Sequence, residues 1–99
     1  MMTDPGLHVG SNADRTSTVR LSGEVAASGI AAVRAAFESA GGSGPLIVDL
    51  TDVTYLDAAA VDLLLEVAAD RGLDLILGPG CAVFPVVRLS GLDRVATLR

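Results

Sequence analysis

Hydrophobic and polar residues alternate between residues 18 and 25, with the apolar side chains on one side of the chain. A period of two is typical of a strand that is buried on one face. The segment 46–50 is instead almost entirely apolar, which predicts a parallel strand covered on both faces. Two shorter apolar segments predict further strands at residues 73–77 and 95–98.

A helical period appears in the segments between these strands. The first helix is expected at residues 28–40, with Ser28 as its N-cap and Gly41 as the residue that ends it. The second helix begins at Asp57 and ends before Gly72. A third is expected between Cys81 and Ser90, beginning near residues 82–84, because the proline at position 85 is tolerated only in a first turn.

Strands and helices that alternate along a chain predict an α/β fold. We expect a single domain in which three helices pack on a mixed, mostly parallel sheet of four to five strands. The length of 99 residues and the apolar content of 51% suit one hydrophobic core. The domain is expected at residues 17–99. Residues 1–16 are expected to be irregular, with residues 7–9 as a candidate short edge strand.

Composition and charge make several classes of function unexpected for this chain. The net charge is −5, the seven basic residues are scattered arginines, and only three residues are aromatic, so nucleic acid is not an expected partner. No apolar run is long enough for a membrane span, so direct membrane insertion is not expected. One cysteine and no signal-peptide pattern predict a cytoplasmic protein. The sequence contains no recognisable catalytic pair, metal-ligand pattern or cofactor motif. No enzyme activity, metal or cofactor is therefore predicted.

The segment from Leu46 to Ala69, LIVDLTDVTYLDAAAVDLLLEVAA, resembles the phosphorylation-site region of STAS domains, the family of bacterial anti-sigma-factor antagonists. In that family an Asp-Ser-Ser-Gly tetrad opens the helix, and a partner kinase phosphorylates the first serine. Here the tetrad is Asp57-Ala58-Ala59-Ala60. The phosphoacceptor position is therefore Ala58, and no phosphorylation is expected there. RLSGE at residues 20–24 and SGLDRV at residues 90–95 extend the resemblance over most of the chain.

The resemblance implies a non-catalytic module that binds a kinase-like anti-sigma factor and so releases a sigma factor for transcription. The start of the second helix is then the centre of contact. A plainer interpretation makes Asp57 only an N-cap that accepts from the N–H of Ala59 or Ala60. The residues expected to bind the partner are Glu24, Asp57, Ala58, Ala59, Ala60 and Asp62.

Two alternatives keep the same fold. STAS domains also serve as accessory subunits of lipid-transport ABC systems and as sensors of small ligands or nucleotides, and a lost phosphoacceptor suits both roles. Family members usually continue into one more helix after the position of Arg99, so this chain is expected to be either a short version that lacks this helix or a piece of a longer protein. The sequence leaves open whether the domain forms a homodimer.

Overall fold

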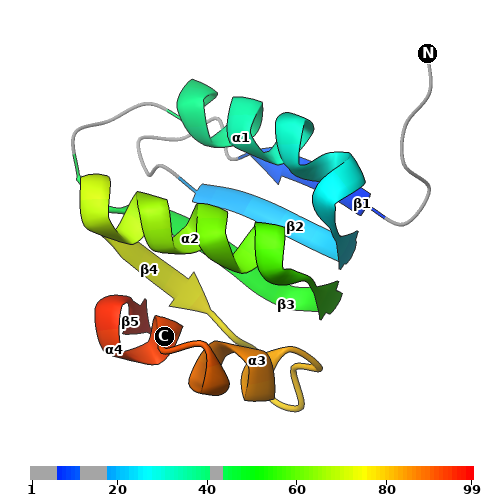
Figure 1. Cartoon of the computed structure of the whole chain (residues 1–99), viewed down its shortest axis with the longest axis vertical. Coiled ribbons are helices and arrows are strands. Elements are labelled where there is room, and N and C mark those ends of the chain that lie inside the picture. The colour runs from blue at the N-terminus through cyan, green and yellow to red at the C-terminus, as the bar shows by residue number, and fades with distance from the viewer. Residues whose placement is uncertain (1–6, 12–17, 41–43) are drawn as a thin grey trace.

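The computed structural model describes residues 7–11, 18–40 and 44–99. Its strands form one five-stranded sheet in the order β1-β2-β3-β4-β5 (Figure 1). β1 runs antiparallel to β2, and the other neighbouring strands are parallel. The sequence prediction of a mixed, mostly parallel α/β sheet is therefore confirmed. The strands are β1 (Leu7–Ser11), β2 (Thr18–Val25), β3 (Leu46–Leu56), β4 (Leu73–Ile76) and β5 (Thr97–Leu98).

The described residues contain four α-helices rather than the expected three. Pro85 lies in the first turn of the third helix, as its missing N–H requires. Gly91, at φ +85°, then allows the chain to turn and begin a separate four-residue helix that ends at Val95. The last strand consequently starts later than predicted. The helices are η1 (Ala27–Gly29, a 3₁₀ turn), α1 (Ile30–Ser39), α2 (Ala58–Asp70), α3 (Phe84–Leu89) and α4 (Leu92–Val95).

The first helix also begins differently from the prediction. Ser28 is not its N-cap, because residues 27–29 form the 3₁₀ turn η1 and α1 starts after Gly29. The Gly29 N–H donates to the carbonyl of Ala26 at 2.9 Å, which tightens the backbone there. The predicted end of this helix at Gly41 lies outside the described residues.

The helices cover one face of the sheet, because parallel strands in sequential order with right-handed connections place every connection on the same side. Figure 1 shows α1 and α2 in front of the strands. Leu46, Val48 and Leu50 are buried beneath them. Ile47 and Asp49 point to the opposite face and are only partly buried. The expectation that β3 is covered on both faces is therefore wrong.

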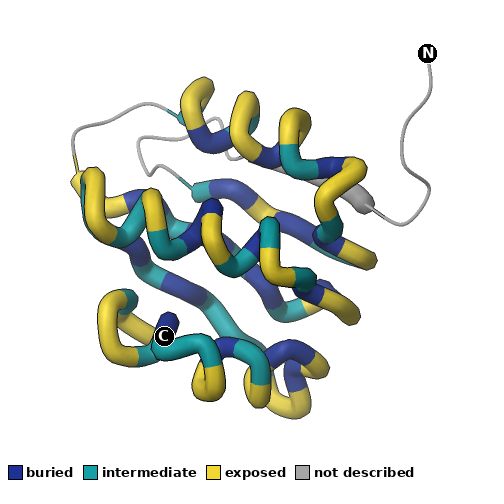
Figure 2. The backbone as a smooth tube through the Cα atoms, in the orientation of Figure 1, coloured by how far each residue is buried: buried dark blue, intermediate teal, exposed yellow. Residues whose placement is uncertain are grey.

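The core lies between the covered face of the sheet and the helices, and Figure 2 shows buried residues on both layers. Val33 and Phe37 of α1 and Leu63 and Leu64 of α2 contribute to it. Cys81 is also buried, and its thiol donates to the carbonyl of Leu50 at 3.2 Å. Burial and this hydrogen bond make Cys81 part of the core packing.

Candidate functional site

Asp57 joins three segments at the carboxyl ends of β2 and β3. Its Oδ1 accepts a hydrogen bond from the N–H of Ala60 at 3.0 Å, which caps α2. Its Oδ2 accepts from the N–H of Ala27, in η1, at 2.8 Å. Its own N–H donates to the carbonyl of Val25 at 3.1 Å. The start of α2 is thus tied to the chain that leaves β2.

The cap was predicted from the sequence, but the bond to Ala27 was not. An N-cap contributes about 1 kcal/mol to stability. Hydrogen bonds to an ionised carboxylate are stronger than neutral ones, so the second bond adds to the first. Both carboxylate oxygens of Asp57 are therefore occupied within the domain. The residue acts here by holding η1 and α2 together.

The three alanines after Asp57 do not lie on one flat surface. Ala58 is exposed and Ala59 is partly buried. Ala60 is only 2% exposed and packs in the core. The exposed surface at this helix start is therefore that of Ala58, with part of Ala59, while Ala60 contributes its N–H to the cap.

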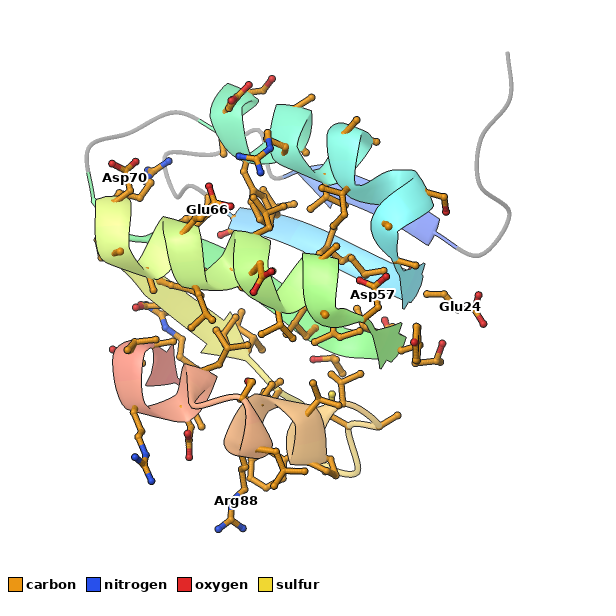
Figure 3. All side chains as sticks on the ribbon, in the orientation of Figure 1. Glu24, Asp57, Glu66, Asp70 and Arg88 are labelled. Carbon is orange, nitrogen blue, oxygen red and sulfur yellow. The ribbon has the colours of Figure 1, made fainter. Side chains whose placement is uncertain are left out.

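Glu24 and Tyr55 border this helix start on the sheet side. They are register partners in the parallel pairing of β2 and β3, and both side chains are exposed. Figure 3 shows Glu24 and Asp57 at the same end of the domain. Tyr55 is 52% exposed, the most exposed aromatic side chain among the described residues. Its exposure depends on packing that the sequence pattern does not reveal, and tyrosine is among the residues enriched at the energetic centres of protein interfaces.

Asp62 lies one turn after Ala58 on the same face of α2, and Glu66 and Asp70 continue that line. All four residues are exposed. Glu66 is engaged by Arg34 of α1, with 3.4 Å between Nη2 and Oε2. The acidic line is thus partly neutralised away from the helix start, and Asp62 is its member closest to Ala58.

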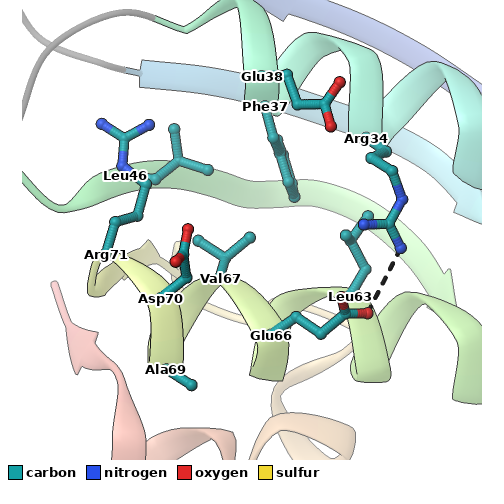
Figure 4. A pocket seen from close by; sticks show the side chains of 10 residues that line it. All are labelled: Arg34, Phe37, Glu38, Leu46, Leu63, Glu66, Val67, Ala69, Asp70 and Arg71. Carbon is teal, nitrogen blue, oxygen red and sulfur yellow. Dashed lines mark hydrogen bonds and ion pairs between the residues drawn. The ribbon is translucent and has the colours of Figure 1, made fainter.

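An open groove of about 650 Å³ separates the C-terminal part of α2 from α1 (Figure 4). Phe37, Leu46 and Leu63 are among its apolar lining residues. At one end the Arg71 guanidinium donates to the carbonyls of Ala40, at 3.3 Å, and Gly44, at 2.9 Å. Much of the charge around this groove is therefore used in contacts within the domain.

The described residues hold neither a cluster of metal-binding side chains nor a membrane-spanning helix. They contain no group of three or more His, Cys, Asp or Glu side chains arranged to hold a metal ion. None of the helices in residues 18–40 and 44–99 is long and apolar enough to cross a membrane.

The fold and this helix start define a class: a small α/β domain with the helices on one face and a capped helix start presented at the sheet end. A family model described as "Mlab, STAS domain" matches residues 9–99. The chain therefore belongs to the STAS domain family, whose members are generally non-catalytic interaction modules. A search of curated proteins finds no match.

Proposed function

We propose that this STAS domain is a non-catalytic module that binds a partner protein through the start of α2. The proposed contact surface consists of exposed Ala58 with Ala59, bordered by Glu24, Tyr55 and Asp62. The observation that carries the proposal is the pair of hydrogen bonds from Ala60 and Ala27 to Asp57, which hold this surface in one shape before binding. A preformed surface binds without a cost of ordering its loops.

The proposed partner is an anti-sigma factor with a kinase-like ATP-binding fold. The domain would compete with the sigma factor for this protein and so release the sigma factor. In the family, phosphate on the serine at this position expels the partner by charge and bulk. Ala58 carries no hydroxyl, so the surface stays competent to bind whatever the activity of the kinase. The proposed role is therefore that of a constitutive antagonist.

The test compares two substitutions at one position, using a kinase-like anti-sigma factor of the source organism as the partner. Ala58→Asp places a negative charge next to Asp57, at the centre of the proposed contact surface, and is expected to weaken binding by at least about tenfold. Ala58→Ser, the control, is similar in size and uncharged, and should bind nearly as the natural chain does. With ATP present, the partner should phosphorylate only the serine variant, and the phosphorylated form should dissociate. Equal affinity of the natural and aspartate forms would overturn the assignment of this surface.

A second candidate keeps the surface and changes the partner to a subunit of a lipid-transport ABC system. It is favoured by the matching family model, whose description names Mlab. The same two variants distinguish the candidates when the ATPase subunit of such a system is the binding partner. Binding to that subunit that is lost in Ala58→Asp, with no binding to a kinase-like protein, would select the second candidate.

A further inference from the structure

A second exposed surface lies on the short helices α3 and α4. Leu89, the last residue of α3, is 89% exposed, and Val95, the last residue of α4, is 54% exposed. Phe84 is 41% exposed. Single exposed apolar side chains are common on proteins, but here three fall within residues 84–95, on two helices that contact each other.

This segment also carries positive charge in an acidic protein. Residues 84–99 contain three arginines and one aspartate, whereas the whole chain has a net charge of −5. Arg88 and Arg94 form no ion pair with the described residues, and the Arg88 guanidinium lies 6.0 Å from the ring centre of Phe84. Figure 3 shows Arg88 directed away from the body of the domain. We call Phe84, Arg88, Leu89, Arg94 and Val95 the α3–α4 surface.

The α3–α4 surface is separate from the helix start around Asp57. α4 contacts α2, and Figure 1 places it beside the C-terminal part of that helix, on the side away from α1. Leu92 anchors α4 in the core and is fully buried. The outward side chains of α3 and α4 are therefore held on a packed support and are not needed to close the core.

Charge and symmetry distinguish three possible binding partners of the α3–α4 surface: a second copy of the chain, a membrane and another protein. A twofold dimer through the α3–α4 surface would bring two positively charged surfaces together, with Arg88 and Arg94 of both copies in one interface, which costs energy. An anionic membrane would attract Arg88 and Arg94 but repel the rest of a chain that carries −5. A partner that presents apolar and acidic side chains together complements both features of the surface.

We propose that the α3–α4 surface docks an acidic amphipathic helix of a partner protein. Apolar residues of that helix contact Leu89, Val95 and Phe84, and its carboxylates pair with Arg88 and Arg94. This proposal rests on side chains distinct from those of the proposed antagonist function, so each can fail without the other.

The probe is a synthetic helical peptide with leucines at every third or fourth position and glutamates beside them. It is titrated into the isotope-labelled chain while backbone amide resonances are recorded. The expected changes are confined to residues 81–99 and weaken as salt is added, because the attraction is partly electrostatic. A peptide with lysine in place of every glutamate is expected to produce no such changes.

Three variants make the result specific. Arg88→Glu with Arg94→Glu is expected to weaken peptide binding by about tenfold or more, and Leu89→Ser by a smaller factor. Arg34→Glu, on α1, makes the same kind of charge change on another surface and should leave binding unchanged. The natural anti-sigma or transporter partner supplies an independent measurement, since Leu89→Ser should not affect contacts around Ala58.

Several results would overturn the proposal. They are peptide-induced changes that centre on the start of α2, equal binding of the lysine peptide, and an unaltered affinity of the double arginine variant. Sedimentation of the chain with vesicles of anionic lipid, lost in Leu89→Ser, would assign the surface to a membrane instead. Concentration-dependent dimerisation that Leu89→Ser abolishes would assign it to a second copy of the chain.

Discussion

The two exposed ends of this domain are built in different ways. At the start of α2 the Asp57 carboxylate accepts from two backbone N–H groups of the domain, and the exposed residue at the centre of the surface is Ala58. On α3 and α4 the apolar groups Leu89 and Val95 are left outside, together with Arg88. The first surface is defined by the shape of the backbone and the second by the chemistry of its side chains. A single charge introduced at the surface around Ala58 should therefore be enough to change binding there. At the α3–α4 surface, removal of a single side chain should be enough.

The largest expected effect contrasts two leucines only three residues apart. Leu92→Ala removes a fully buried side chain that anchors α4 and should lower the free energy of unfolding by about 3 kcal/mol. Leu89→Ala, in the 89% exposed residue, should change it by less than about 0.5 kcal/mol. Urea unfolding followed by circular dichroism gives both values. A comparable loss in the two variants would mean that Leu89 is packed and that the α3–α4 surface is not free to bind.

A smaller loss of stability is expected from a substitution at the start of α2. Asp57→Ala removes the cap of α2 and the bond to Ala27, and should cost about 2 kcal/mol. Asp62→Ala, its control on the exposed face of the same helix, should stay within about 0.5 kcal/mol. The same unfolding measurement applies. Hydrogen exchange should also show faster opening of residues 26–29 in the Asp57 variant, and unchanged exchange there would contradict the role of Asp57 as a link to η1.

The smallest expected change in the free energy of unfolding is an increase rather than a decrease. The first turn of α2 contains no acidic residue, so Ala58→Asp adds a negative charge at the positive end of the helix dipole. The neighbouring Asp57 carboxylate repels the new charge and offsets part of this interaction, so we expect a gain in stability of only about 0.3 kcal/mol at low ionic strength, reduced by added salt. A thermal unfolding scan at two salt concentrations tests it. The variant should therefore lose partner binding while its fold becomes slightly more stable, whereas a destabilised variant would undermine its use as a binding test.

The sequence predicted the features that depend on neighbouring residues. The cap at Asp57, the extent of α2 and the late start of α3 before Pro85 all follow from patterns within a few positions. The hydrogen bond from the Ala27 N–H to the Asp57 carboxylate was missed. The two residues are 30 positions apart and meet only through the parallel pairing of β2 and β3.

Other misses have equally specific causes. α4 has four residues, too few for a helical period to show in the sequence. The open face of β3 depends on the strand order of the whole sheet, which the apolar segment 46–50 alone does not encode. At the candidate site, burial of Ala60 and exposure of Tyr55 likewise depend on packing between elements.

The bond between Asp57 and Ala27 has a consequence for folding as well as for shape. Local contacts such as the α2 cap form early and at little entropic cost, whereas contacts between distant positions require a long loop to close first. The surface around Ala58 therefore reaches its final form only after β2 and β3 have paired and η1 has arrived beside α2. A partner that recognises this surface would therefore find it complete only in domains where β2 and β3 have already paired.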